Sequence, residues 1–160
     1  MEYLKKIEEL IRKYSEKGKM IAFAESCTGG FLSHMFTNIS GASEVFERGV
    51  VCYSNEAKRE LLNVDAHTLE HYGAVSEQVA YQLCQGIRDI SGTEAGVGVT
   101  GIAGPTGGTP EKPVGLVYIG FASEKRTFVS KHIFKSNRIR FKELVLEQVL
   151  LILEEYISST

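Results

Sequence analysis

The apolar residues along the chain follow two spacings, one typical of helices and one typical of buried strands. Leu4, Ile7, Leu10, Ile11 and Tyr14 share one helical stripe, which predicts an amphipathic helix over residues 3–14 that ends by Gly18. The same kind of stripe predicts further helices over residues 31–36, 55–62, 77–90 and 138–157. Short apolar or β-branched runs predict strands over residues 20–24, 46–53, 95–100, 114–122 and 127–134.

The order of these elements predicts the fold class. Helices that alternate with strands are typical of a layered α/β domain, and the two adjacent strands near the C-terminus add an antiparallel pair. We therefore expect a single domain over residues 1–160, with a mixed, partly parallel sheet flanked by helices.

Composition narrows the classes of partner. The 160 residues are 43% hydrophobic and 24% charged, with a net charge of −2, so no global field recruits nucleic acid or an anionic membrane. No apolar run approaches the roughly 20 residues of a membrane span, and the N-terminal segment is amphipathic, unlike a signal peptide. We expect a cytoplasmic protein in which any bound anion is held by a local site.

Cysteine and histidine give no metal or disulfide pattern. Cys27, Cys52 and Cys84 are odd in number and widely spaced, so we interpret them as reduced, mostly structural thiols. His67 and His71 stand four apart but lack the Glu of His-Glu-x-x-His and a third ligand, which favours a surface helix over a metal site. We expect neither a metal nor another cofactor.

The segment AESCTGG, residues 24–30, lies where a predicted strand meets a helix. A tight turn there can expose the Ser26 hydroxyl and aim backbone N–H groups at an anion. Ser26 or Thr28 could equally be a helix N-cap without any chemistry, and the heptapeptide alone favours that simpler role.

The segment YSNEAK places Tyr53 and Lys58 across a strand-to-helix boundary. A lysine is protonated at neutral pH and acts as a base only if burial or a neighbouring cation lowers its pKa. The ordinary alternative is a solvated helix lysine, and nothing local decides between the two.

Two further segments complete the candidate chemistry. The glycine-rich loop TGIAGPTGG, residues 100–108, follows a buried strand, so in a parallel sheet it shares the carboxyl edge with Ser26. It matches neither the P-loop nor the Gly-x-Gly-x-x-Gly pattern. The segment FKSNRIR, residues 134–140, opens the last helix with three cations, which serve either surface solubility or a bound anion.

In their order along the chain, AESCTGG, FERGVVCYSNEAK, HYGAVSE, VTGIAGPTGGTPEKPVG and the basic start of the last helix resemble the CinA C-terminal domain family. The resemblance covers nearly the whole chain. It implies an amidohydrolase that converts nicotinamide mononucleotide to nicotinic acid mononucleotide and ammonia without a metal, as stand-alone members of that family do in pyridine nucleotide salvage.

Residue by residue, the resemblance assigns Ser26 as nucleophile and Tyr53 and Lys58 as the pair that activates it, with Thr100 as a site threonine. The expected oxyanion donors are backbone N–H groups near Ser26 and Cys27, or the Thr100 hydroxyl. The expected substrate-binding residues are Cys27, Thr28, Gly29, Gly30, Gly101, Gly104, Arg138 and Arg140.

The family pattern Phe-x-Gly-Asp-Arg is not kept before the last helix. Ser136 and Asn137 replace its Gly and Asp, so Arg138 is the best match to the substrate-contacting arginine, with Arg140 or Lys142 as substitutes.

Several alternatives stay open. Cys27 is a rival nucleophile, ranked below Ser26 because no histidine partner is evident. The domain could instead be a catalytically silent binding or interaction module, or hydrolyse another carboxamide or a nucleotide phosphoester. A domain of this size is also expected to form a homo-oligomer.

Overall fold

The computed structural model describes residues 2–160. In chain order the elements are α1 (Glu2–Glu16), β1 (Ile21–Glu25), α2 (Phe31–Thr37), the 3₁₀ turn η1 (Ala42–Glu44), β2 (Phe46–Val51), α3 (Asn55–Leu62), α4 (Ala66–Tyr72), α5 (Glu77–Ser91), β3 (Ala95–Gly101), β4 (Leu116–Ala122), β5 (Thr127–Ile133) and α6 (Arg138–Ser158).

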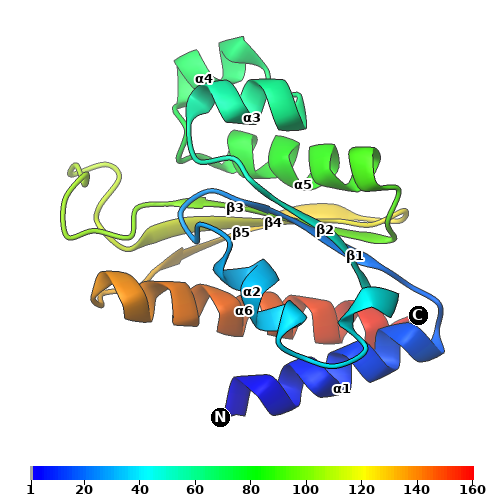
Figure 1. The fold of residues 1–160 in the computed structure, drawn as a ribbon. Coiled ribbons are helices and arrows are strands. Elements are labelled where there is room, and N and C mark those ends of the chain that lie inside the picture. The colour runs from blue at the N-terminus through cyan, green and yellow to red at the C-terminus, as the bar shows by residue number, and fades with distance from the viewer. Residues whose placement is uncertain (1) are drawn as a thin grey trace.

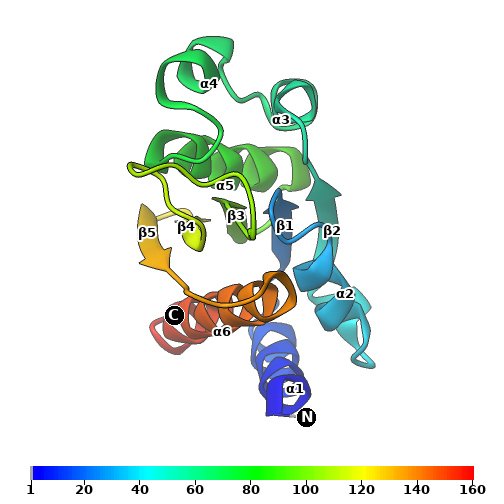
Figure 2. The ribbon, with the colours of Figure 1, turned by 90° about the vertical axis from the view of Figure 1, so that its left-hand side faces the viewer.

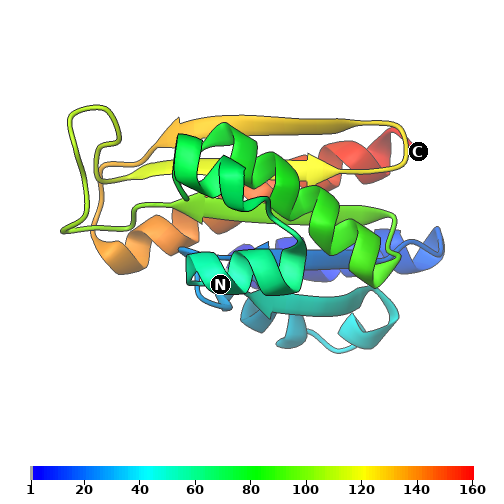
Figure 3. The same cartoon turned by 90° about the horizontal axis from the view of Figure 1, so that it is seen from above.

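The five strands form one mixed sheet in the order β2-β1-β3-β4-β5 (Figure 3). β1 is parallel to β2 and to β3, whereas β3–β4 and β4–β5 are antiparallel pairs. The expected α/β class with a mixed, partly parallel sheet is confirmed.

Helices cover both faces of the sheet (Figures 1 and 2). α5 lies on one face with α3 and α4 outside it, and α1, α2 and α6 lie on the other. β1 serves both layers, since its side chains point alternately to the two faces. Ile21 and Phe23 join the core under α1, α2 and α6, and Ala22 and Ala24 join the core under α5.

Glycines let α5 approach the sheet closely. A Cβ at Gly98 would lie 2.6 Å from the Leu83 Cβ, and one at Gly120 would lie 2.4 Å from the Ala80 carbonyl oxygen. Val97 and Val99 point to the opposite core. The alternating AGVGVT segment therefore has one face for a closely packed helix and one for apolar side chains.

The end of β2 differs from the sequence prediction. The predicted strand 46–53 ends at Val51, and Cys52 and Tyr53 leave the sheet, although the Cys52 N–H still donates to the Glu25 carbonyl at 2.9 Å. His67 and His71 lie exposed on α4, as the surface-helix interpretation predicts. Within residues 2–160, no helix has the length and apolarity needed to cross a membrane.

Candidate active site

Three loops meet at the carboxyl edge of the parallel strands. Ser26 follows β1, Tyr53 follows β2, and the glycine-rich loop follows β3. At this edge the chain leaves β1 toward β2 on one side and leaves β3 toward β4 on the other, so the direction of the connections reverses between β1 and β3. Open α/β sheets bind ligands in the crevice made by such a reversal. Figure 2 shows the loop after β3 beside the turn after β1 and the start of α6.

Lys58 reaches this crevice from the first turns of α3. Ser54 caps that helix, its Oγ accepting a hydrogen bond from the Ala57 N–H at 3.0 Å. The Lys58 Nζ lies 2.9 Å from the Ser26 Oγ and donates to the main-chain oxygens of Cys52 and Tyr53, both at 3.0 Å. Lys58 is 1% exposed, and no carboxylate of residues 2–160 forms an ion pair with it.

Burial lowers the pKa of Lys58, because removing the ammonium group from water disfavours the charged form. A neutral amine has two N–H donors and one lone pair. When the Cys52 and Tyr53 carbonyls accept the two N–H groups, the lone pair is left to face the Ser26 hydroxyl. The geometry thus suits proton transfer from Ser26 to Lys58.

Burial has the opposite consequence for the neighbouring Cys27, whose reactive form is the charged one. Burial raises the pKa of Cys27 to about 12, so at neutral pH it is a thiol and not a thiolate. Because the thiolate is the nucleophilic form, the environment of Cys27 disfavours it as the nucleophile.

Glu25 holds the turn that carries Ser26. It is fully buried, and its carboxylate accepts four hydrogen bonds, from the Thr28 hydroxyl at 2.7 Å, the Leu32 N–H at 2.9 Å, and the Ser33 N–H and hydroxyl at 3.0 and 2.7 Å. These donors belong to the turn and to the first residues of α2. The carboxylate therefore ties the end of β1 to the start of the helix that follows Ser26.

A cleft of about 460 Å³ opens above Ser26 and Lys58, a volume in the range of small-molecule sites. Eight of the residues expected at the site line it, namely Ser26, Cys27, Tyr53, Lys58, Thr100, Gly101, Gly104 and Arg138. The structure thus brings together segments that are up to 112 positions apart, from Ser26 to Arg138.

Arg138 lies at the mouth of this cleft. Its Nη1 donates to the Gly104 carbonyl at 2.7 Å, and its Nη2 donates to the Tyr53 hydroxyl at 3.3 Å. The Tyr53 ring is 62% exposed. Tyr53 therefore contacts Lys58 through its carbonyl and Arg138 through its hydroxyl, and not Ser26 directly as expected for an activating side chain.

Two of the expected oxyanion donors are already bonded. The Ser26 N–H donates to the Val99 carbonyl at 3.1 Å, and the Thr100 hydroxyl donates to the Ala74 carbonyl at 2.8 Å. The Cys27 N–H has no main-chain acceptor within the described part of the chain. It is therefore a candidate oxyanion donor.

Four expected binding residues lie outside the cleft. Thr28 turns toward Glu25, and Gly29 and Gly30, with φ of 60° and 99°, form the turn into α2. Arg140 points away, where it donates to the Tyr3 hydroxyl at 2.6 Å and pairs with Glu143 at 2.9 Å.

Lys142, the other substitute, lies closer to the site. Its Nζ is 3.7 Å from the position that a Cβ of Gly29 would occupy. It is four residues after Arg138, so both side chains project from the same side of α6.

Ala74 and Val75, which line the cleft, and Glu25, which holds the turn, were not among the residues predicted for the site. The sequence did contain features that could have pointed to all three residues. Ala74 and Val75 belong to the HYGAVSE segment, and Glu25 is a charged residue next to an apolar strand. Across residues 2–160, no group of three or more His, Cys, Asp or Glu side chains is placed to hold a metal ion.

The family model described as the CinA C-terminal domain matches residues 4–157. A putative competence-damage inducible protein of Thermoanaerobacter pseudethanolicus is 47% identical over 152 residues, covering 94% of this chain and 37% of the relative. A CinA-like protein of Kosmotoga olearia is 49% identical over 126 residues, covering 78% of this chain and 31% of the relative. The chain thus spans about a third of the length of these curated relatives.

Solved structures with the same fold are similar in length to this chain. The competence/damage inducible protein CihA from Agrobacterium tumefaciens is 37% identical, with a TM-score of 0.90 and coverage of 99% of this chain and 95% of that chain. A CinA superfamily protein from Klebsiella pneumoniae is 26% identical, with a TM-score of 0.94 and 99% coverage of both chains.

We predict that Glu25→Gln destabilises the protein by about 2 to 4 kcal/mol, because a buried amide offers an N–H group where the carboxylate accepted hydrogen bonds. The free energy of unfolding in urea measures this. Glu47→Gln is the matched control, since Glu47 pairs with Arg48 at the surface and its loss should cost less than about 1 kcal/mol. Equal effects of the two variants would contradict a structural role for Glu25.

Proposed function

The chain belongs to the CinA C-terminal domain family, and on that premise we propose that it is an amidohydrolase. Its proposed reaction converts nicotinamide mononucleotide to nicotinic acid mononucleotide and ammonia, as the resemblance of its motifs to the stand-alone members of this family implies. Ser26 is the nucleophile and Lys58 is the base.

The observation that carries this proposal is the buried pair of Lys58 and Ser26, whose Nζ and Oγ are 2.9 Å apart. A carboxamide is a poor electrophile, so its hydrolysis needs an activated nucleophile. A lysine at the surface would be an ammonium group without a free lone pair. Burial at Lys58 favours the neutral amine, which can take a proton from Ser26.

In the first half of the reaction, Lys58 takes the Ser26 proton while the Oγ attacks the carboxamide carbon. The tetrahedral intermediate carries a negative oxygen, for which the Cys27 N–H, which has no main-chain acceptor among the described residues, is the proposed donor. The C–N bond then breaks, the Lys58 ammonium gives its proton to the departing nitrogen, and ammonia leaves an ester on Ser26.

In the second half, neutral Lys58 takes a proton from water as the water oxygen attacks the ester. The C–O bond to Ser26 breaks, and the proton passes from Lys58 back to the Ser26 oxygen. The product is the carboxylic acid, released in its ionised form, and the enzyme returns to its starting state. No step requires a metal.

Arg138 is the proposed contact for the 5′-phosphate. It lies at the cleft mouth on the first turn of α6, where helix N–H groups also favour an anion. The contacts to Gly104 and Tyr53 hold its guanidinium in place. Lys142, beside Gly29, adds a second positive charge.

The homo-oligomer expected from the sequence also remains part of the proposal. Ile139, the residue after Arg138 in the chain, is 75% exposed, and such a large exposed apolar side chain is suited to a subunit contact.

We predict that the purified protein releases ammonia from nicotinamide mononucleotide in the presence of EDTA, and not from free nicotinamide. Ser26→Ala should abolish release, whereas Cys27→Ala should retain it, because Cys27 is a buried thiol and not the attacking group. An ammonia assay with all three proteins measures this.

The reverse pattern, with Cys27→Ala inactive and Ser26→Ala active, would contradict the assignment of the nucleophile. Nucleotide binding without ammonia release by the folded wild type would instead favour the silent binding module.

We predict that kcat/KM rises with pH as Lys58 loses its proton, with a midpoint below the ordinary lysine value of 10.5 because burial lowers this pKa. Lys58→Met should remove the activity. Arg59→Met, which changes the neighbouring exposed cation paired with Glu56, should keep the wild-type profile. A rate that stays constant or falls as pH rises would exclude neutral Lys58 as the base.

We predict that Arg138→Ala raises KM for the nucleotide about tenfold or more, because it removes a charged contact to the phosphate. Arg140→Ala is the matched control on the same turn and should change KM little, since Arg140 faces Tyr3 and Glu143. Steady-state kinetics with both variants tests the choice between the two arginines. A larger effect at Arg140 would contradict it.

A further inference from the structure

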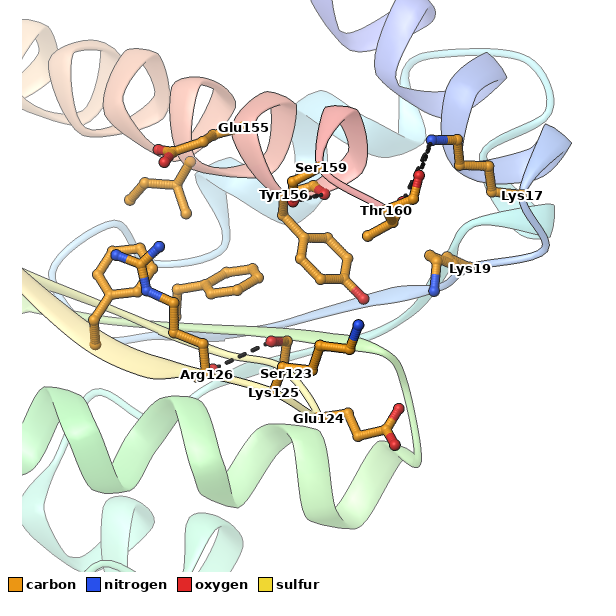
Figure 4. A pocket seen from close by; sticks show the side chains of 13 residues that line it. Lys17, Lys19, Ser123, Glu124, Lys125, Arg126, Glu155, Tyr156, Ser159 and Thr160 are labelled. Carbon is orange, nitrogen blue, oxygen red and sulfur yellow. Dashed lines mark hydrogen bonds between the residues drawn. The ribbon is translucent and has the colours of Figure 1, made fainter.

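A second cavity, of about 740 Å³, lies at the opposite end of the sheet from Ser26. It is formed by the β4–β5 turn, the end of α6 and the segment after α1 (Figure 4). The register of the sheet separates the two sites. Ala122, at the turn, pairs with Gly96 near the start of β3, whereas the cleft residue Thr100 lies near the end of that strand.

Aromatic rings form much of the apolar lining of this second cavity. The Phe121 ring lies 5.5 Å from the Phe128 ring and 5.3 Å from the Tyr156 ring, measured between centroids, with interplanar angles of 37° and 52°. Ile152 of α6 adds an aliphatic side chain. These surfaces suit an apolar or aromatic ligand body.

Cations surround the rings and lack carboxylate partners. The Lys19 Nζ lies 5.8 Å from the Tyr156 ring centroid, and the Arg126 guanidinium lies 4.3 Å from that of Phe128. Lys125 is exposed beside them. Within residues 2–160, six other Lys or Arg side chains form ion pairs, but none of these three does.

The positively charged groups of Lys19 and Lys125 point into the same part of the cavity. In Figure 4 the amino groups of Lys19 and Lys125 and the hydroxyl of Tyr156 point toward one another. Glu124 and Glu155 also line the cavity, but Figure 4 shows their carboxylates apart from these groups. Like charges that point into the same space repel each other, and an anion between them offsets that repulsion.

We propose that this cavity binds a small amphipathic anion, an aromatic body that carries a carboxylate, sulfonate or phosphate group. The aromatic body lies on Phe128 and Tyr156, against both of which the buried Phe121 ring packs, and the anionic group lies between Lys19 and Lys125. The volume is in the range of sites that enclose most of a small ligand. The site is separate from the proposed amidohydrolase cleft and does not depend on that activity.

The probe for this site is 8-anilinonaphthalene-1-sulfonate, whose fluorescence rises in apolar surroundings. We expect saturable binding of one probe per chain to the native protein. Lys19→Met together with Lys125→Met should weaken the affinity about tenfold or more, because the variant loses both charged contacts but keeps apolar side chains. Uncharged N-phenyl-1-naphthylamine should bind more weakly than the sulfonate.

Lys131→Met together with Lys135→Met is the matched control. It removes the same charge from exposed positions outside the cavity and should leave the affinity unchanged. Arg138→Ala should also leave it unchanged, which separates this site from the cleft. Near-ultraviolet circular dichroism confirms that each variant is folded before titration.

Three results would overturn the proposal. They are the absence of saturable binding, an equal loss of affinity in the control variant, and equally tight binding of the uncharged probe. Sedimentation velocity adds a fourth. A dimer that dissociates in the Lys19→Met, Lys125→Met variant, with probe binding only to the monomer, would assign this face to a second copy of the chain.

Discussion

A lysine amino group buried without a carboxylate partner is the constraint on which the candidate active site depends. The Lys58 Nζ contacts only uncharged oxygens, and it donates hydrogen bonds to two of them, the main-chain carbonyls of Cys52 and Tyr53. Those carbonyls can face Lys58 because the chain leaves the sheet after Val51 and turns into α3. The early end of this edge strand is therefore part of how the site is built, since a longer strand would direct these carbonyls toward ladder positions.

Ser26 is held from two sides by different means. On the sheet side, its N–H bonds to Val99, and the preceding carbonyl of Glu25 accepts the Cys52 N–H, so the ends of all three parallel strands are linked. On the helix side, the Glu25 carboxylate fixes the first residues of α2. Such support on both sides limits the movement of Ser26, which the proposed attack on a substrate requires.

The sequence predicts the parts of this architecture that depend on local pattern. α1 and α5 have strong apolar stripes, and parallel strands at one edge bring Ser26 and Thr100 together. The burial of Lys58 could not be predicted, because it depends on how α3 packs against the rest of the chain. The choice of Arg138 over Arg140 depends on the rotation of α6, which places Arg140 against Tyr3 from the other end of the chain.

The close packing of α5 on Gly98 and Gly120 sets the width of the cleft between its Ala74–Val75 wall and Ser26. α5 begins at the Ser76 cap, and Ala74 and Val75 just before it form one wall above Thr100. The thickness of this helix–sheet layer thus determines how far that wall stands from Ser26. A methyl group added to either glycine would push α5 away from the sheet. The cleft at Ser26 would then widen, although neither glycine lines it.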